Sequence, residues 1–279
     1  MFDRVRRRLR RLKNETRSTL WSLRWRGKRK PLSALVRVRD GGEFLMPSVE
    51  SIISLVEEVV VVDNYSRDNT PKVIQEMAAR YPGKLRACRY DHDVATVGED
   101  SARLYHQDPT SPCLLHNYYN WCMALCRHPF VLKWDDDMLA SDKLVEAIED
   151  FKQSRYLQFE FGGHNISSDF KHVLTWKAGI EARVYPSNTK FLMGDYGGVV
   201  KSGFTGQYMG ETPAMWVASK YTLRLEHPLY AHLKYCKRNP GSNQSQAFRK
   251  ALESEIKTGE SISEEFKLLL QKYLGHAST

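Results

Sequence analysis

The chain has 279 residues, 42% of them hydrophobic, which is typical of a water-soluble protein with one large or two small domains. It has no apolar run long enough to cross a membrane and no apolar signal-peptide core. Its net charge of +9 is unevenly distributed, because residues 1–30 hold 13 Lys and Arg and two acids, whereas the remainder holds 29 basic and 31 acidic residues. A basic tail on a near-neutral body argues against a nucleic-acid-binding core. The five cysteines lack metal-site spacing, so we expect free thiols and a cytoplasmic protein.

Residues 1–30 predict a basic amphipathic helix. Apolar side chains recur there every three or four residues, and arginines occupy the other faces. Trp21 and Trp25 lie beside the apolar stripe as candidate interfacial anchors. The pattern favours peripheral attachment to an anionic membrane surface, on the inner face of the membrane. A disordered basic arm and a helix docked on the body or a partner remain the alternatives. The stripe consists of Phe2, Val5, Leu9, Leu12, Thr16, Leu20 and Leu23.

The segment 31–151 alternates between expected strands and helices. We expect strands at 32–38, 59–62, 85–90 and 130–134, and helices at 44–56, 70–80, 114–126 and from 141 to 151. Thr70 is the expected N-cap of its helix, with Pro71 in the first turn, and Ser141 caps the last. Residues 91–112 are polar and predict a long irregular loop. This alternation predicts an α/β, Rossmann-like, mostly parallel sheet flanked by helices.

The second half of the chain changes in character. In residues 152–240, strand-like pieces at 156–161 and 173–176 alternate with glycine pairs, which predicts a mixed second wall. Residues 241–279 predict closing helices at 242–257 and 263–274, with Ser261 and Glu264 as a capping box for the last one. We therefore divide the chain into a tail (1–30), a body (31–240, with halves 31–151 and 152–240) and C-terminal helices (241–279).

Three consecutive aspartates, Asp135, Asp136 and Asp137, follow the apolar strand at 130–134. Three adjacent carboxylates repel one another unless a cation joins them, and hard oxygen ligands suit Mn²⁺ or Mg²⁺. A solvated acidic turn before the next helix is the alternative. Ligands of such sheets bind beyond the carboxyl ends of the strands. Other polar residues follow the neighbouring strands, namely Arg37, Arg39, Asp40, Asp63 and Ser66.

Four segments between residues 32 and 150 carry a resemblance to a known family. They are VRVRD at 36–40 followed by GEFL at 42–45, VVVDNYSRDNT at 60–70, NYYNW at 117–121, and KWDDDM at 133–138. These segments resemble the GT-A glycosyltransferases, and are most similar to the large inverting family two with its "VVDDGSTDGT" segment and Asp-x-Asp motif. The resemblance implies a GT-A fold, a nucleotide-sugar donor that is UDP-linked, and a Mn²⁺ or Mg²⁺ ion.

The resemblance also implies roles for individual residues. Asp63 would bind the base, with a turn cap as the alternative, and Asp135 would contact ribose or a metal-bound water. Asp137 would hold the metal, and Asp136 occupies the variable middle position. His232 is a candidate addition to the metal ligands, with a structural loop histidine as the alternative. The nucleotide pocket would further include Arg37, Arg39, Ser66 and Lys133; for Arg37 the alternative is a pair with Asp40.

The family's general base is less clearly matched. Glu211 in Gly210-Glu211-Thr212 is the nearest match, and Asp195 is its rival, so that a retaining mechanism also remains open. The implied activity is hexosyl transfer to a glycan or lipid-linked acceptor in surface polysaccharide synthesis. The alternatives are a nucleotidyltransferase acting on a sugar phosphate and a non-catalytic sugar-binding protein.

Overall fold

The computed structural model describes residues 2–95, 99–174, 178–195, 209–214, 216–237 and 260–275. The helices are α1 (Phe2–Trp25), α2 (Leu45–Ile52), α3 (Thr70–Arg80), α4 (Glu99–Gln107), α5 (Leu115–Leu125), α6 (Asp142–Gln153) and α8 (Glu264–Leu274), with 3₁₀ turns at Ile53–Leu55 and Ser219–Tyr221. The strands are β1 (Leu32–Val38), β2 (Glu58–Asp63), β3 (Leu85–Arg89), β4 (Phe130–Asp135), β5 (Met138–Ala140), β6 (Gln158–Asn165), β7 (His172–Val173), β8 (Ala178–Pro186), β9 (Phe191–Asp195), β10 (Met209–Pro213), β11 (Thr222–Arg224), β12 (Tyr230–His232) and β13 (Glu260–Ser261).

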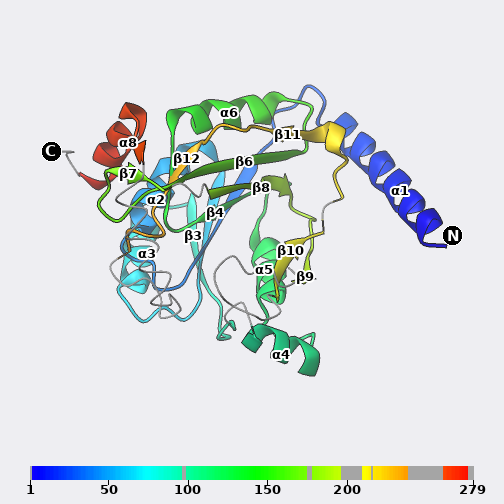
Figure 1. Cartoon of the computed structure of the whole chain (residues 1–279), viewed down its shortest axis with the longest axis horizontal. Coiled ribbons are helices and arrows are strands. Elements are labelled where there is room, and N and C mark those ends of the chain that lie inside the picture. The colour runs from blue at the N-terminus through cyan, green and yellow to red at the C-terminus, as the bar shows by residue number, and fades with distance from the viewer. Residues whose placement is uncertain are drawn as a thin grey trace.

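One large sheet organises the molecule (Figure 1). Its strand order is β3-β2-β1-β4-β8-β6-β12-β5, and β11 pairs in parallel with the first three residues of β6. The first four strands are parallel, as expected for strands joined through helices. β8 runs antiparallel to both β4 and β6, which brings the second half of the chain into the same sheet. The predicted mixed α/β, mostly parallel sheet is therefore confirmed, and its layout is consistent with a GT-A fold.

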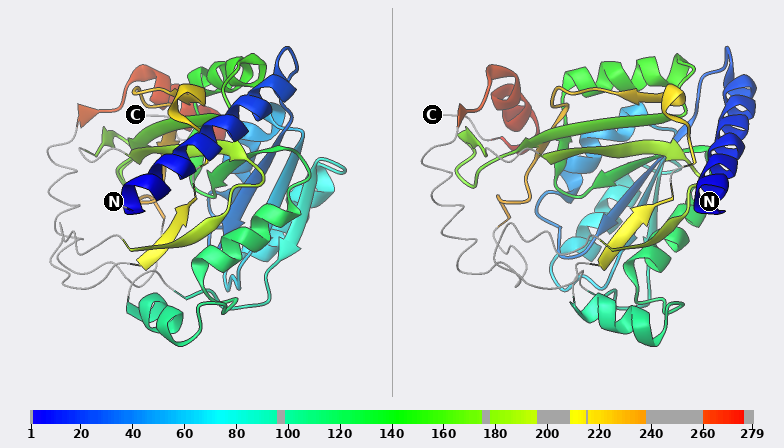
Figure 2. Two further views of the ribbon diagram at one scale, coloured as in Figure 1. Left: turned by 90° about the vertical axis from the view of Figure 1, so that its right-hand side faces the viewer. Right: turned by 45° about the vertical axis from the view of Figure 1, so that its right-hand side comes forward.

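Helices cover both faces of this sheet, as Figures 1 and 2 show. Ala34 and Val36 of β1 pack into a core with α2, α3 and α6, whereas Leu35 packs into a second core with α5. The alternation follows from the pleat, because successive strand side chains point to opposite faces. A third core joins α8 to β12 and the segment after it. Both faces of β2 are covered, which accounts for its uninterrupted run of valines.

The tail forms the predicted helix, α1, and its last turns are docked on the body. Trp21 and Trp25 meet the ring of Phe130 edge-on, at centroid distances of 6.0 and 5.4 Å. Ser18 is fully buried and accepts a hydrogen bond from the backbone N–H of Ala218 at 3.0 Å. The predicted role of the two tryptophans as interfacial anchors is therefore wrong, since their rings serve to hold the helix on the sheet. Among the described helices, none has the length and apolar content to span a bilayer.

The structure corrects several local predictions. The expected loop at 91–112 contains α4, and the N-cap position of α3 is Asn69, because Thr70 is already helical. The N-cap of α8 is Ser263, whereas Ser261, expected in a capping box, belongs to β13. Ser141 caps α6 as predicted, accepting from the N–H of Leu144. The expected helix at 242–257 lies outside the described residues.

Candidate functional site

The carboxyl ends of β1, β2 and β4 bring the predicted polar residues to one edge of the sheet. In the parallel registers, Val38 pairs with Asp63, and Arg37 pairs with Asp135. Asp63 and Asp135 end buried apolar strands, and Arg37 is the next-to-last residue of β1, so the polar side chains emerge where the packed core stops. The site predicted at this edge thus has at least three of its members on adjoining strands.

The loops that follow β1 and β2 are bound to each other. The N–H of Asp40 donates to Ser66 Oγ at 2.9 Å, and the N–H of Arg67 donates to the Asp40 carboxylate at 2.6 Å. Asp63 is 7% exposed, and its Oδ1 accepts from the N–H of Ser66 at 3.2 Å. The turn-capping contact is therefore present at Asp63. Ser66 acts here as a link between loops, and its predicted contact with a nucleotide stays a prediction.

A cavity of about 290 Å³ opens beside this edge. Arg37 and Arg39, both predicted to line a nucleotide pocket, contribute to its wall. Arg39 is held by an ion pair with Asp93, with 2.7 Å between Nη1 and Oδ1. The volume is near the lower limit for small-molecule sites, which suits a planar base or a nucleoside. The other lining residues are Val38, Asn64, Val94, Ala95, Leu115 and Tyr118.

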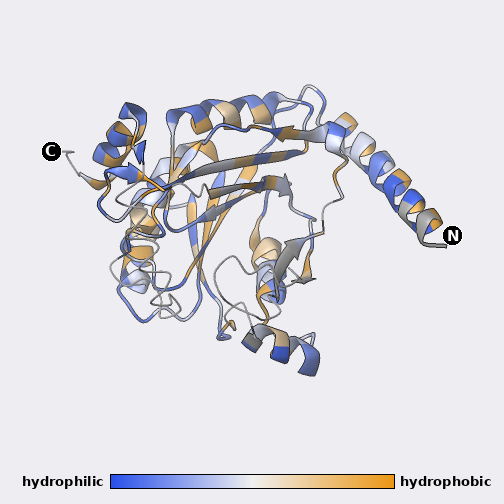
Figure 3. Cartoon of the chain, viewed as in Figure 1, coloured by the Kyte–Doolittle hydropathy of each residue, from blue (hydrophilic) through white to orange (hydrophobic). Residues whose placement is uncertain are grey.

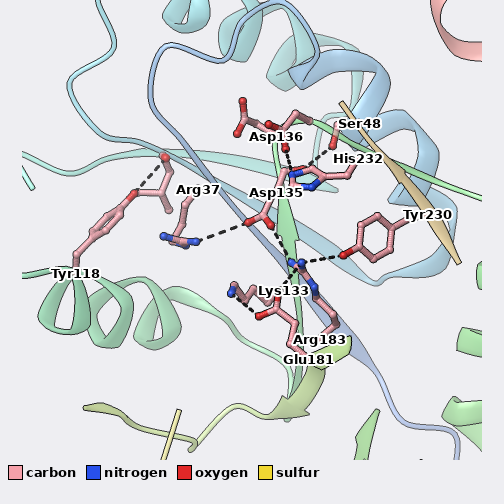
Figure 4. A network of polar contacts seen from close by, with 12 residues as sticks. Arg37, Ser48, Tyr118, Lys133, Asp135, Asp136, Glu181, Arg183, Tyr230 and His232 are labelled. Carbon is pink, nitrogen blue, oxygen red and sulfur yellow. Dashed lines mark hydrogen bonds and ion pairs between the residues drawn. The ribbon is translucent and has the colours of Figure 1, made fainter. Parts of the chain in front are cut away.

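Asp135 lies in a network of cations, drawn in Figure 4. Arg183 Nη1 is 2.8 Å from its Oδ2, and Arg37 Nη2 is 3.8 Å from its Oδ1. The Arg37 guanidinium also stacks 3.5 Å from the ring centre of Tyr119. Burial would raise the pKa of Asp135, but Arg183, Lys133 and Arg37 outweigh it and hold the pKa well below its ordinary value. Arg37 thus pairs with Asp135, and the alternative pairing with Asp40 is wrong.

The same network extends to β8 and β12. Arg183 also contacts Glu181 Oε1 at 2.5 Å and donates to the Tyr230 hydroxyl at 3.1 Å. Lys133 pairs with Glu181 at 3.3 Å, so its predicted nucleotide contact stays a prediction. Each cation of this network therefore faces at least one acceptor, which is the condition for keeping charges in a buried place.

Asp136 and Asp137 share a different cation. Lys237 Nζ lies 2.9 Å from Asp136 Oδ2 and 2.8 Å from Asp137 Oδ2. Burial and the neighbouring Asp137 raise the pKa of Asp136, whereas His232 and Lys237 overcome the burial of Asp137 and lower its pKa. The Asp136 carboxylate packs so close to Gly41 that a Cβ at that glycine would lie 1.8 Å from Oδ2. The triplet is therefore divided, with Asp135 on one set of cations and its two successors on another.

The donor set around Asp137 fits a divalent cation. His232 Nε2 is 3.2 Å from Asp137 Oδ1, and its Nδ1 is 2.9 Å from the Asn165 side-chain oxygen. An Nδ1–H that donates a hydrogen bond to that oxygen would leave Nε2 as the atom that binds a metal ion. The carboxylate oxygens suit Mn²⁺ or Mg²⁺. Within the described residues, no three His, Cys, Asp or Glu side chains form a preformed metal cage, and Lys237 holds two of the carboxylates.

The two candidate general bases lie on one small antiparallel ribbon. Asp195 ends β9, where it pairs with Met209, and Glu211 lies in β10, where it pairs with Met193. Their backbones are thus two ladder positions apart. This ribbon contacts α5, the helix that borders the cavity. The side chains of both residues lie outside the description, so the choice between them stays open.

Sequence reasoning missed most of the side chains that reach the triplet from the second half of the chain. Arg183, Glu181 and Tyr230 belong to strands whose place in the sheet was not predicted, and Asn165 ends β6. A weak signal was present in β8, where a charged residue stands between Ala182 and Val184 in a segment that becomes buried. Tyr118 and Tyr119 had a clearer signal, because they lie on the aromatic-rich helix before the acidic motif.

Comparison with known proteins gives only weak structural likenesses. No family model matches the sequence, and no curated protein matches it. The structure of residues 1–349 of TarS from S. aureus is similar over 88% of this chain and 70% of that one, with 13% identity and a TM-score of 0.44. The mannosyltransferase PcManGT from Pyrobaculum calidifontis, in complex with GDP-Man and Mn²⁺, is similar over 54% of this chain and 44% of its own, with 16% identity and a TM-score of 0.37.

Glucosyl-3-phosphoglycerate synthase from Mycobacterium tuberculosis, in complex with Mn²⁺, UDP and glucosyl-3-phosphoglycerate, shows a similar level of likeness. It has 14% identity and a TM-score of 0.31, over 50% of this chain and 44% of that one. This chain thus spans less than half the length of the last two proteins. Likenesses of this strength say nothing about what this chain binds or catalyses.

Proposed function

We propose that the chain is a metal-dependent glycosyltransferase that uses a nucleotide-sugar donor. The observation that carries the proposal is the edge formed by β1, β2 and β4, where Arg37 lines a cavity, Asp63 ends the neighbouring strand, and the Asp135–Asp137 triplet begins at the end of β4. A nucleotide sugar needs three kinds of group together: a pocket for the base, cations for the diphosphate, and carboxylates that hold a metal ion. All three kinds lie along this one edge.

The cavity would hold the nucleoside. Asp63, on the strand next to the cavity, would accept a hydrogen bond from an N–H of the base, as in a UDP-linked donor. Arg37, held flat against Tyr119, presents its guanidinium between the cavity and Asp135. A guanidinium in this position would pair with ribose or phosphate oxygens without first having to become ordered. Arg39, Ser66 and Lys133 would complete the pocket.

Asp137 and His232 would hold the metal ion, with Asp135 and Asp136 as neighbours. When bound, the ion supplies positive charge to the diphosphate that leaves from the sugar. Lys237 is the protein's own cation at this place, bridging Asp136 and Asp137. Its ammonium would turn from the carboxylates to the phosphate oxygens, so that the leaving group meets a positive charge on a buried surface.

Glu211 or Asp195 would remove the proton from the acceptor hydroxyl, which gives inversion at the sugar carbon. The acceptor would be a glycan or a lipid-linked glycan in the synthesis of a surface polysaccharide, on the cytoplasmic side of the membrane. Substitution of each acid separately distinguishes them: the Glu211→Gln and Asp195→Asn variants should both bind nucleotide, and only one should lose transfer.

A thermal-shift screen tests the proposal directly. The full chain is heated with UDP, UDP-glucose and GDP-mannose, each with and without Mn²⁺, and with ATP and CTP as comparison nucleotides. We expect one nucleotide sugar to raise the melting temperature, and Mn²⁺ to enlarge the shift, since a ligand that binds only the folded state stabilises it. Slow release of the nucleoside diphosphate would confirm catalysis. Stabilisation by a nucleoside triphosphate alone would favour a nucleotidyltransferase, and no stabilisation by any nucleotide would refute the proposal.

A further inference from the structure

Helix α1 leaves an aliphatic stripe uncovered on the outside of the molecule. Figure 2 shows the helix lying along the outside of the body, and Figure 3 shows hydrophobic positions recurring among hydrophilic ones along it. The exposed fractions run from 50% to 62%, which is unusual for aliphatic side chains at five positions of one helix. The stripe is formed by Val5, Leu9, Leu12, Leu20 and Leu23.

The stripe faces away from the body. At about 100° per residue, the five aliphatic residues fall within a sector of about 80°. Ser18, Trp21 and Trp25, which contact the body, fall on the opposite side of the helix, about 180° away. In the last turns of α1 the body therefore packs on one face, and the aliphatic face is left uncovered along the helix.

The contacts of its last turns fix the helix in this orientation. Trp21 packs between Phe130 and Trp216, with centroid distances of 6.0 and 5.5 Å, and Arg17 lies 3.9 Å above the Trp216 ring. Just after the helix, Lys30 is fully buried and donates to the carbonyl of Phe151 at 2.8 Å, at the carboxyl end of α6. An aromatic clamp followed by a buried lysine holds the stripe pointing outward.

The charged residues beside the stripe indicate the kind of surface that it would contact. Arg6 and Lys13 flank it on one side and Arg8 on the other, and all three side chains are exposed. In the described part of the chain, none of the three pairs with an acidic side chain. An aliphatic stripe edged by unpaired cations fits a surface that is apolar below and anionic above, as the headgroup region of an anionic bilayer is. A second copy of α1 would bring its own arginines against these, so charge disfavours that occupant.

We propose that α1 attaches the protein to anionic lipid bilayers through this stripe, with the tryptophan face kept on the body. The helix then lies in the plane of the bilayer surface, and the body has a fixed orientation above it. This attachment does not depend on the proposed sugar transfer, because the residues involved are separate from the Asp135–Asp137 edge.

Co-sedimentation of the full chain with vesicles tests this inference. One set of vesicles contains about 30% phosphatidylglycerol in phosphatidylcholine, and the other contains phosphatidylcholine alone. We expect binding to the anionic set to be at least about tenfold tighter, and to weaken between about 0.1 and 0.5 M NaCl. The triple variant Leu9→Gln, Leu12→Gln, Leu20→Gln keeps every charge and should bind at least about tenfold more weakly, because the apolar contribution is lost.

Leu268→Gln is the matched control, because Leu268 is 59% exposed on α8 and belongs to no such stripe. It should bind like the wild type. Gln favours helices nearly as well as Leu does, so circular dichroism of all three proteins should agree. If the wild type stays in the supernatant, or if the triple variant binds as tightly as the wild type, the inference is wrong. A wild-type dimer in sedimentation equilibrium that the triple variant abolishes, without vesicle binding, would identify a second copy as the occupant instead.

Discussion

The two sides of the acidic triplet are built in different ways. On the first side, Arg37, Asp63 and Asp135 come from the ends of parallel strands that lie next to one another. On the second side, Arg183 comes from β8, His232 from β12 and Lys237 from the segment after β12, about 50 to 100 residues along the chain. The first side is fixed by the sheet itself, whereas the second depends on long-range packing.

This difference gives the three aspartates different environments. Asp135 is neutralised by arginines, which cannot lose their protons and which lie in a buried network. Asp136 and Asp137 share the flexible ammonium of Lys237, a side chain that can change partners. We therefore interpret Asp135 as the fixed residue of the triplet. Asp137 is the residue that could release the Lys237 ammonium and bind a metal ion in its place.

We expect the largest loss of stability from replacing Arg183, the cation by which the second side contacts the first. Its side chain is 4% exposed, and Arg183→Met would leave the Asp135 carboxylate with Arg37, at 3.8 Å, and the charge of Lys133. We expect a loss of about 3–5 kcal/mol in the free energy of unfolding, measured with urea, because a buried charge loses its partner. Arg224→Met is the control, since Arg224 is 52% exposed, and it should cost less than about 1 kcal/mol. Equal effects of the two substitutions would mean that the second side does not stabilise the first.

Asp137→Asn separates the function of the triplet from its stability. We expect donor turnover to fall by at least about a hundredfold, because even residues that merely position metal ligands cost about 10- to 100-fold when replaced. The melting temperature should stay near that of the wild type. Asp142→Asn, at a position whose side chain is 89% exposed, should leave turnover unchanged. If Asp136→Asn proves more damaging than Asp137→Asn, the assignment of roles within the triplet must be reversed.

Gly41→Ala tests how tightly the first side is packed. The new Cβ would lie 1.8 Å from Asp136 Oδ2, so the carboxylate or the loop must move. We expect a cost of about 1–3 kcal/mol in unfolding free energy, as for other overpacked sites, together with weaker metal-dependent donor binding. Gly179→Ala on β8 is the matched control, because nothing lies within 4 Å of its added Cβ. Similar stability of both variants would show that the Gly41 loop adjusts freely.

The smallest expected effect is the contribution of Asp135 to the pH dependence of the unfolding free energy. Its pKa is lower in the folded state than in the unfolded chain, so the stabilisation it contributes is fully present above about pH 4 and is lost as the pH falls toward the folded pKa. A single titrating carboxyl changes stability by at most about 1.4 kcal/mol per pH unit. The 27% exposure of the Asp135 side chain makes the expected change smaller, because solvent screens the charge. The unfolding free energy of the wild type should therefore fall more steeply between about pH 4.5 and 2.5 than that of Asp135→Asn. Parallel slopes for the two proteins would contradict this.

The strand ends were predictable because their signal is local. An apolar run such as 130–134 that stops at an acid indicates a buried strand and the residue where it ends. Parallel pairing of such strands then places Asp63, Arg37 and Asp135 at the same edge of the sheet. The predicted N-caps were wrong where two capping residues lie close together in the sequence. Asn69 and Thr70 are adjacent, and Ser261 and Ser263 are two residues apart. Local preferences at adjacent positions differ too little to select one of them.

Amphipathicity predicted that α1 is a helix, but did not predict which face meets the body. Both its aliphatic stripe and its tryptophan face are apolar enough to be buried, and the choice follows from Phe130 and Trp216, which the chain brings together only on folding. Periodicity reports that a face is apolar; the shape of the surface opposite decides which face is covered.

The sequence by itself determined the parallel edge, its row of acids and the basic tail, because strand alternation and charge clustering are properties of short segments. Only the tertiary structure decided which cation each acid receives. Arg183 reaches Asp135 because β8 runs antiparallel beside β4, and Lys237 reaches Asp136 and Asp137 because β12 pairs with β5, directly after the triplet. Pairings across 50 to 100 residues depend on packing free energy shared by the whole sheet, which no single segment records.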